Sequence, residues 1–339
     1  MPLSEQKIVA FRKELIAWFR RFGRDLPWRH TSDPYAILVS EIMLQQTQVA
    51  TVVGYFERWM KRFPTTAALA QAGEAEVLQY WQGLGYYSRA RNLHAAARRV
   101  EEVHGGRFPA TEAEIRALPG VGEYTAAAVA TFAFDHPTPP LDGNIIRVLA
   151  RLLDFREPVD TSGARKRLRE IATAWQPGKG AGVFNEALME LGALVCTPRA
   201  PQCPTCPVRH YCAAETPGKL PVKKPRPKTV RLTEKCAWLV RCGPDGEPEI
   251  CLEQQTGKRW RGLWKLPLLE ENNSHPKEPL LQLEYPFTHH RITLQVYSME
   301  RNILRNTCAW FSWRALPAMT APHLRAAREL LEKFSFVQK

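Results

Sequence analysis

The sequence has no run of eighteen apolar residues, so it offers no candidate for a membrane-spanning helix. Its start, MPLSEQKIVAFRKELIAWF, mixes charges along an amphipathic pattern and differs from a signal peptide, so we expect a soluble cytoplasmic protein without a membrane partner. Internal repeats are missing as well. Acids are scarce: 34 Asp and Glu against 47 Lys and Arg leave a net charge of +13. This imbalance favours a polyanionic partner.

The pattern of apolar residues changes along the 339 residues, a length typical of two to three domains. Up to about residue 215, apolar residues recur at helical spacing in short segments, which is typical of a compact helical bundle. The segments are 5–22, 36–49, 51–62, 66–72, 74–82, 86–104, 111–117, 123–134, 143–155, 162–175 and 184–196.

A different composition follows. PGKLPVKKPRPKTVR (217–231) holds six basic residues and four prolines, which predicts an extended linker that lies on a polyanion or joins two domains. Beyond it, short runs of strand character and a last helix predict an α+β domain. The strands are expected at 236–242, 249–255, 291–300 and 308–313, and the helix at 320–334.

The segment from Leu118 to Asp142 combines several features of a nucleic-acid site. Gly120 and Gly122 flank Val121 directly before a run of helix formers. Glycines allow a tight hairpin whose amides, at the head of the next helix, suit a DNA phosphate. An ordinary helix-to-helix turn fits the same residues. Asp142, in turn, precedes Gly143 and has the position of a helix N-cap.

Glu41 lies in the middle of AILVSEIMLQQTQV (36–49), a helix that is apolar nearly all round. A buried carboxyl is costly unless it is protonated, paired or useful, so Glu41 is either a paired structural acid or a functional one. GLGYYSRARNL (83–93) interleaves glycine, tyrosine and arginine, a composition suited to a nucleic-acid groove or to a basic helix after a glycine cap.

Four cysteines follow the spacing C-x6-C-x2-C-x5-C, at Cys196, Cys203, Cys206 and Cys212. Four thiolates within 17 residues can surround one metal centre. The spacing fits a [4Fe–4S] cluster better than zinc, because zinc sites usually pair two C-x2-C units and only one is present. The other cysteines are expected in the core: Cys236, Cys242, Cys251 and Cys308.

Taken together, LPGVG-x-x-T, LDGN and the cysteine spacing resemble the helix-hairpin-helix DNA glycosylases that carry an iron–sulfur cluster. LPWR, DPY, SEIMLQQTQV and GLGYYSRARNL narrow the resemblance to the adenine DNA glycosylase family. The fold it implies is a mainly α N-terminal region with two helical subdomains, followed by a separate α+β, Nudix-like domain. The implied boundaries are 1–22 with 135–215 for the cluster subdomain, 23–134 for a six-helix subdomain, 216–231 for the linker, and 232–339 for the lesion-recognition domain.

The resemblance implies removal of adenine mispaired with 8-oxoguanine, and also with guanine, after the base is flipped out. Glu41 then matches the acid that protonates adenine, and Asp142 the carboxylate that stabilises or captures the oxocarbenium ion. Tyr124 and Asn144 match residues that assist them. Because Tyr124 occupies the position of the Schiff-base lysine of endonuclease III-like relatives, a monofunctional hydrolase is expected.

The same resemblance implies contacts to substrate. Arg29, Leu44 and Glu186 match the adenine pocket, and Gln46 and Tyr86 match side chains that wedge into the duplex. Gly120 and Gly122 match the phosphate-binding hairpin. Phe287, Thr288 and His289 match a Phe-Ser-His loop that reads 8-oxoguanine, although Thr replaces Ser and His290 competes with His289 for that role.

The implied cofactor is a [4Fe–4S] cluster on the four clustered cysteines, and the implied partner is double-stranded DNA with 8-oxoguanine:adenine mispairs. We expect a monomer associated with the nucleoid of a bacterium. Two rivals remain. A bifunctional pyrimidine glycosylase/lyase is opposed by Tyr124, and a non-catalytic lesion-binding protein is opposed by the presence of both Glu41 and Asp142.

Overall fold

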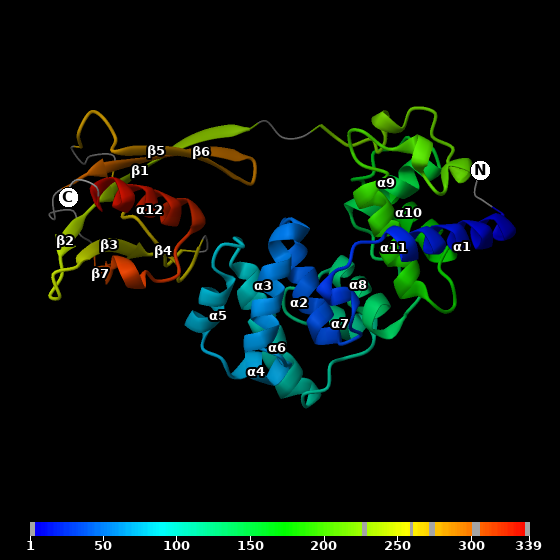
Figure 1. Cartoon of the computed structure of the whole chain (residues 1–339), viewed down its shortest axis with the longest axis horizontal. Helices are drawn as coiled ribbons and strands as arrows, with labels where there is room; N and C mark the ends of the chain where they lie inside the picture. The colour runs from blue at the N-terminus through cyan, green and yellow to red at the C-terminus, as the bar shows by residue number, and fades with distance from the viewer. Residues whose placement is uncertain (1–3, 226–228, 258–259, 271–274, 300–305, 336–339) are drawn as a thin grey trace. The chain divides into compact units, whose positions relative to one another are not determined.

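The structure, a computed structural model, describes residues 4–225, 229–257, 260–270, 275–299 and 306–335 (Figure 1). By their contacts these residues form two compact units. The first comprises 4–72 and 92–225, and the second comprises 73–91 and the described residues from 229 onward. A helical N-terminal part and an α+β C-terminal part are therefore present, as predicted. The finer domain boundaries stay a prediction. None of the described helices is long and apolar enough to span a membrane.

The first unit consists of short α-helices joined by tight connections and 3₁₀ turns. Its helices are α1 (Glu5–Phe22), α2 (Pro34–Leu44), α3 (Val49–Arg62), α4 (Thr66–Gln71), α7 (Glu112–Arg116), α8 (Glu123–Phe134), α9 (Gly143–Leu152), α10 (Ser162–Ala174) and α11 (Ala181–Leu194), with most of α6 (Ser88–His104). Its 3₁₀ turns are η1 (Pro27–Arg29), η2 (Cys203–Thr205), η3 (Arg209–Tyr211) and η4 (Pro217–Lys219).

One core of the first unit joins the start of the chain to residues after 142. On α1, Phe11 and Leu15 have no solvent exposure and pack into a cluster built from α9, α10 and α11. The Phe11 ring lies 5.5 Å from that of Trp175 and 6.2 Å from that of Phe184. Burying each such side chain contributes about 1.5–3 kcal/mol, which ties α1 to helices far along the chain.

Helices α2 and α8 form the other element pair that matters for the site. Nearly every residue of α2 is buried, and so are Thr125 to Thr131 of α8, whose four alanines allow a close approach. Asp33 caps α2 by accepting a hydrogen bond from the Tyr35 amide. The predicted helix 36–49 was too long. It ends at Leu44 because Gln46 has φ 59°, and α3 begins at Val49.

The hairpin between α7 and α8 requires its first glycine. Gly120 has φ 74°, and a Cβ there would lie 2.4 Å from the Cβ of Asn92. Any side chain would therefore be strained in both backbone and packing. Gly122 is the N-cap of α8, and both glycines are exposed. The hairpin thus presents the first turn of α8 at the surface.

The proline-rich segment is not extended throughout. η4 is a 3₁₀ turn, and Arg151 donates hydrogen bonds to the carbonyl oxygens of Pro217 and Leu220 at 2.8 and 3.1 Å. The Val159 amide donates to Val222 O at 3.0 Å. Residues up to 225 therefore belong to the first unit, and the first strand of the second unit already begins at Val230.

The second unit contains α5 (Glu74–Trp81), α12 (Ala321–Ser335) and two sheets. In one sheet the order is β1-β6-β5, formed by β1 (Val230–Trp238), β6 (His290–Ser298) and β5 (Leu281–Phe287). β1 runs parallel to β6, and β5 runs antiparallel to it. In the other, β3 (Pro248–Gln254) pairs with β2 (Val240–Cys242), β4 (Trp264–Lys265) and β7 (Cys308–Ser312).

The sheets differ from the expectation in several ways, and the short strand β4 is one of the elements that was not predicted. The expected strand 236–242 is two strands, because the chain passes from one sheet to the other at Leu239. Strand β5 was not expected, since Pro286 lies within it. Its alternating exposure marks it as a half-buried strand, and its position at the end of the β1-β6-β5 order allows a proline there. Leu324 and Leu330 of α12 belong to the core over these sheets.

Candidate active site

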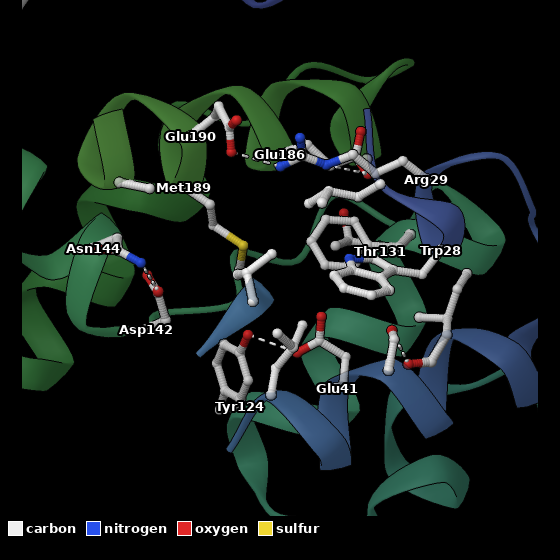
Figure 2. A pocket seen from close by; sticks show the side chains of 18 of the residues that line it. Trp28, Arg29, Glu41, Tyr124, Thr131, Asp142, Asn144, Glu186, Met189 and Glu190 are labelled. Atoms are coloured by element: carbon white, nitrogen blue, oxygen red, sulfur yellow. Dashed lines mark hydrogen bonds and ion pairs between the residues drawn. The ribbon is translucent and has the colours of Figure 1, made fainter. Parts of the chain in front are cut away.

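A cavity of about 720 Å³ lies in the first unit, between η1, α2, α8, α9 and α11 (Figure 2). Its wall includes eight of the residues selected from the sequence, which are Arg29, Glu41, Leu44, Gln46, Tyr124, Asp142, Asn144 and Glu186. The side chain of Met189 points into the middle of the cavity, between Glu41 and Glu190 (Figure 2). Residues from distant parts of the chain thus line one pocket of the size that small ligands occupy.

Glu41 occupies the cavity wall from the middle of α2, and it is 6% exposed. The hydroxyl of Tyr124, in the first turn of α8, donates a hydrogen bond to Glu41 Oε2 at 2.7 Å. Burial raises the pKa of Glu41 to about 7, against the opposing effect of the Tyr124 hydrogen bond, and the negative charges of Asp142 and Glu186 add to the rise. A carboxyl in this state can hold a proton near neutral pH.

Asp142 is both an N-cap and a cavity residue. Its Oδ1 accepts a hydrogen bond from the Ile145 amide at 2.7 Å, and its Oδ2 accepts one from Asn144 Nδ2 at 2.7 Å. Burial raises the pKa of Asp142, while these hydrogen bonds and the charge of Arg147 oppose the rise. The cap fixes one oxygen against α9, and the other is turned toward Asn144 and the cavity.

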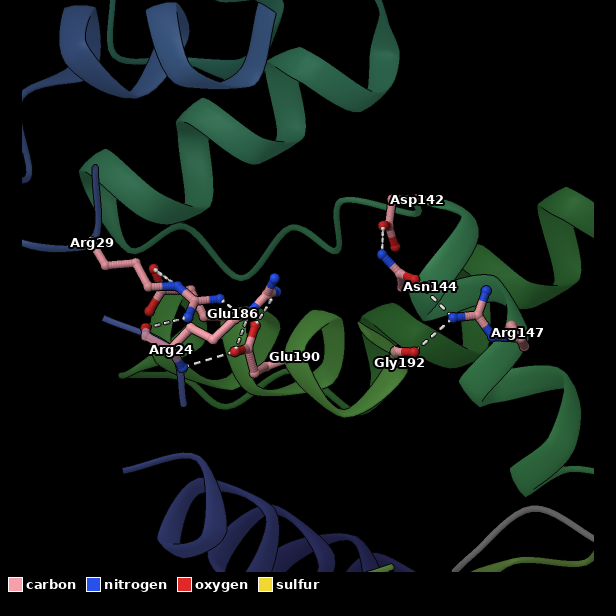
Figure 3. A network of polar contacts seen from close by, with 8 residues as sticks. All are labelled: Arg24, Arg29, Asp142, Asn144, Arg147, Glu186, Glu190 and Gly192. Carbon is pink, nitrogen blue, oxygen red and sulfur yellow. Dashed lines mark hydrogen bonds and ion pairs between the residues drawn. The ribbon is translucent and has the colours of Figure 1, made fainter. Parts of the chain in front are cut away.

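Arg147, which the sequence reading did not select, holds Asn144 in place (Figure 3). Its Nη2 donates to Asn144 Oδ1 and to the Gly192 carbonyl oxygen, both at 2.8 Å, and its Nε donates to Cys196 O at 2.8 Å. Gly192 allows this approach, because a Cβ there would lie 2.6 Å from the Cβ of Asn144. The orientation of Asp142 is therefore fixed by a chain of side chains.

The opposite end of the cavity contains two arginines and two glutamates (Figures 2 and 3). Glu190 has no exposure and accepts hydrogen bonds from Arg24 and Arg29 at 2.8–2.9 Å. Arg29 Nε lies 3.8 Å from Glu186 Oε1. Arg24 and Glu190 were missed. Glu190 could have been found as Glu41 was, because it too lies in an apolar helix, FNEALMELGAL.

Comparison with known proteins fits this geometry. Residues 39–175 match the model of the HhH-GPD superfamily of base excision DNA repair proteins. The adenine DNA glycosylase of Rattus norvegicus is 36% identical over 86% of this chain and 70% of the relative. The chain belongs to the adenine DNA glycosylase family. It is accordingly a DNA glycosylase, a hydrolase that acts on N-glycosyl bonds, and works in base excision repair.

Solved structures agree on the fold of this DNA glycosylase. A thermostable thymine-DNA glycosylase matches 62% of the chain and 97% of its own, with 31% identity and a TM-score of 0.57. A trapped endonuclease III–DNA covalent intermediate matches 64% and 98%, with 25% identity and a TM-score of 0.54. The helical region therefore has the helix-hairpin-helix glycosylase fold, and DNA is the partner that these relatives support.

The four clustered cysteines of the glycosylase lie apart from this cavity. Cys196, Cys203, Cys206 and Cys212 border a second cavity of about 30 Å³, together with Arg151. Arg151 Nη1 lies 3.2 Å from Cys196 Sγ, and the Cys212 thiol donates to Arg151 O at 3.4 Å. Among the described residues, no group of His, Cys, Asp and Glu has the arrangement of a metal-ion site. The structure does bring the four predicted ligands to one place.

Three of the residues predicted to contact DNA or the lesion have a left-handed backbone conformation, that is, a positive φ. Gln46, at the rim of the cavity, has φ 59°, and Tyr86, in the second unit, has φ 47° and is 45% exposed. Thr288 has φ 53° in the turn between β5 and β6, beside Phe287 and His289. Such conformations are costly for residues other than glycine and are often found at functional positions.

Proposed function

We propose that this glycosylase removes adenine mispaired with 8-oxoguanine, or with guanine, and does so without strand cleavage. The observation that carries the proposal is the pair of carboxyl groups, Glu41 and Asp142, on the wall of one cavity with Tyr124 beside them. The family membership supports adenine as the base. The cavity would receive the nucleotide after it is flipped out of the duplex, a step that costs least at a mismatch.

Glu41 is proposed as the general acid that protonates the departing adenine, by analogy with the family at N7. Its pKa of about 7 suits the role, because a general acid works best when it still holds a proton at the working pH. Tyr124 donates its hydrogen to Oε2, which leaves Oε1 to carry the proton toward the base.

Asp142 is proposed to stabilise the oxocarbenium ion that develops on the sugar, or to capture it covalently before water adds. The hydrogen bonds from Ile145 and Asn144 orient the carboxylate, and the Arg147 contact orients Asn144 in turn. Two carboxyls, one acid and one anion, are the arrangement of glycosidic bond hydrolysis.

Tyr124 supports the monofunctional part of the proposal. A lyase of this superfamily needs an amine at that position to form a Schiff base, and a phenol does not supply one. Burial raises the pKa of Tyr124 well above its ordinary value, so the hydroxyl stays protonated and acts as a hydrogen-bond donor. Base release should therefore leave an intact, alkali-labile strand.

For DNA binding we propose the hairpin amides at Gly120 and Gly122 as a phosphate site and the strained Gln46 and Tyr86 as wedges. For the second unit we propose a Nudix-like domain that reads 8-oxoguanine through the turn at Phe287, Thr288 and His289. Thr288 Oγ1 lies 3.3 Å from His290 Nδ1, which makes His290 a support for this turn.

We propose that Cys196, Cys203, Cys206 and Cys212 hold a [4Fe–4S] cluster. The proposal is supported by the spacing of the four cysteines and by their position around one small cavity, since four cysteines are the ligand set of such clusters. When bound, the cluster would hold η2, η3 and the segment after α11 together. It would take no part in the hydrolysis itself. Purified protein should be brown and contain iron. Zinc without iron would contradict this assignment.

Three labelled duplexes test the function. They carry adenine opposite 8-oxoguanine, adenine opposite guanine, and oxidised thymine opposite adenine, and each is assayed with and without hot alkali. Cleavage of the adenine strand only after alkali, fastest opposite 8-oxoguanine, is expected. Alkali-independent cleavage at oxidised thymine would instead indicate a pyrimidine glycosylase/lyase, and binding without cleavage would indicate a lesion-binding protein.

A further inference from the structure

Glu190 accepts four hydrogen bonds, although it lies at the opposite end of the cavity from the proposed catalytic carboxyls. Its Oε1 accepts hydrogen bonds from the Arg24 amide and from Arg24 Nε, both at 2.8 Å. Its Oε2 accepts from Arg24 Nη2 at 2.8 Å and from Arg29 Nη2 at 2.9 Å. Burial raises the pKa of Glu190, but these hydrogen bonds outweigh it and bring the pKa to about 2. Glu190 is therefore a fixed anion.

Arg29 is committed to this cluster through both of its terminal nitrogens. Nη2 donates to Glu190, and Nη1 donates to the Arg24 carbonyl oxygen at 2.9 Å. Arg29 Nε lies 3.8 Å from Glu186 Oε1, which is beyond hydrogen-bond range. The guanidinium therefore forms a long ion pair with Glu186, at 3.8 Å, but no hydrogen bond.

Glu186 is consequently left with its carboxyl open to the cavity. The charged groups that act on it come from three elements: Arg29 and His30 at η1, Glu190 on α11, and Glu41 on α2. Burial raises the pKa of Glu186 to about 7, Arg29 and His30 oppose the rise, and Glu190 adds to it. A neutral carboxyl offers both a donor and an acceptor, which matches a base edge that places a ring nitrogen beside an amine.

We propose that Glu190 is a positioning residue for base recognition. By holding Arg24 and Arg29 it keeps Arg29 from hydrogen-bonding to Glu186, so that the hydrogen-bonding capacity of the Glu186 carboxyl is left for the flipped base. The identity of that base as adenine rests on the proposed function. The arrangement of the four side chains rests on the structure alone.

The test compares wild type with Glu190→Gln in single-turnover base release, measured over protein concentration and from pH 5.5 to 8.5. Without Glu190, Arg29 can close on Glu186 and convert it to an ion. We expect the half-saturating concentration at pH 7 to rise about tenfold, with a smaller change in the rate at saturation. In wild type the half-saturating concentration should rise at alkaline pH, as Glu186 ionises. In Glu190→Gln this rise should begin at a lower pH.

Two further variants separate positioning from mere stabilisation. Arg24→Met breaks the same cluster and should also cost stability, but it leaves the Arg29–Glu190 contact, so the pH profile should stay that of wild type. In a Glu186→Gln background the carboxyl cannot ionise, and adding Glu190→Gln should no longer move the profile. A shift of equal size in Arg24→Met, or one that persists in Glu186→Gln, would overturn the inference.

A measurement without DNA keeps the inference apart from the proposed function. Carbon-13 NMR of protein labelled at the glutamate carboxyl, with the Glu186 signal assigned by Glu186→Gln, follows the titration directly. We expect a midpoint near pH 7 in wild type and a lower one in Glu190→Gln. An unchanged midpoint would sink the positioning role even if adenine is released, whereas failure of wild type to release adenine would leave this result standing.

Discussion

Helices α2 and α11 each bury a glutamate in an apolar run beside the same cavity, yet the two carboxyls differ in charge. On α2, Glu41 meets a neutral partner, the Tyr124 hydroxyl, and burial sets its pKa at about 7. On α11, Glu190 meets two guanidinium groups, which bring its pKa to about 2. Both carboxyls are buried, yet one is a proton carrier and the other a permanent anion.

The difference shows that the hydrogen-bond partners of a buried acid can reverse the direction in which burial moves its pKa. A hydroxyl satisfies the carboxyl's hydrogen bonding without compensating its charge, so the cost of burial remains. Two cations compensate the negative charge of the carboxylate, so neutralising that carboxylate is costly. Glu186, one turn before Glu190, behaves like Glu41: Arg29 lies 3.8 Å away but donates no hydrogen bond to it, and its pKa is about 7.

The largest expected effect concerns Asp142, another carboxyl of the cavity. Asp142→Asn removes the anion that faces the developing positive charge while keeping the cap geometry, so base release should fall by about 10³-fold or more. Binding to the mismatch duplex should be kept. Single-turnover release together with a binding assay checks both, and full activity in this variant would overturn the catalytic assignment.

Glu41→Gln tests the α2 side of the comparison. The amide fills the same space and can still accept from Tyr124, but it has no proton to deliver to the base. Release should slow by about 10³-fold, within the range of general acid catalysis. The variant should fold normally, and a rate within tenfold of wild type would assign proton delivery elsewhere.

Glu190→Gln is the matched change on α11, and its main effect should be on stability. Removing the anion leaves two guanidinium groups near the cavity without their partner, and breaking a buried ion pair costs about 3–5 kcal/mol. Denaturant unfolding at pH 7 measures the loss. Because Glu41→Gln removes an uncompensated buried carboxyl, it should show no comparable loss, and equal destabilisation of the two variants would contradict the comparison.

The pH dependence of stability should separate the two acids by sign. The folded pKa of Glu41 lies above the unfolded value near 4.5, so its penalty is absent below that pH and grows as pH rises to about 7. Glu41→Gln should therefore gain stability over wild type across this window, by up to about 3 kcal/mol.

For Glu190 the folded pKa is depressed, and its contribution is present above about pH 4.5 and lost as pH falls toward 2. The deficit of Glu190→Gln should shrink over that lower window. Unfolding free energies of both variants and wild type, taken from pH 3 to 8, would show the opposite slopes. Parallel curves would refute the assigned pKa values.

Tyr124→Phe should have the smallest effect. It removes one hydrogen bond to Glu41, which is worth about 0.5–1.5 kcal/mol, and so release should slow by about tenfold or less. The pKa of Glu41 should rise further, because the Tyr124 hydrogen bond lowers it, and the alkaline limb of the rate profile should move to higher pH. A limb that moves to lower pH would mean that the Tyr124 hydroxyl does not lower the pKa of Glu41.

Much of the site was predictable because its signals are local. Glu41 is conspicuous in an apolar helix, Asp142 precedes a helix start, and the cysteine spacing is compact. Glu190 carries the same signal as Glu41 and was overlooked. Arg24 and Arg147 had no such signal, since a single arginine in a mixed-charge sequence resembles a solvated one. The early end of α2 was also unpredictable, because it depends on the strained backbone of Gln46.

By itself the sequence determined where most helices and the α+β part lie, which acids lie within apolar helices, and which cysteines are close along the chain. These follow from hydrophobic periodicity and short-range spacing. Only the tertiary structure decided the charge of each buried acid. Arg24 reaches Glu190 across 166 residues, and Tyr124 reaches Glu41 across 83. A pKa depends on the few ångströms around a carboxyl, and folding alone decides whether a phenol or a guanidinium occupies them.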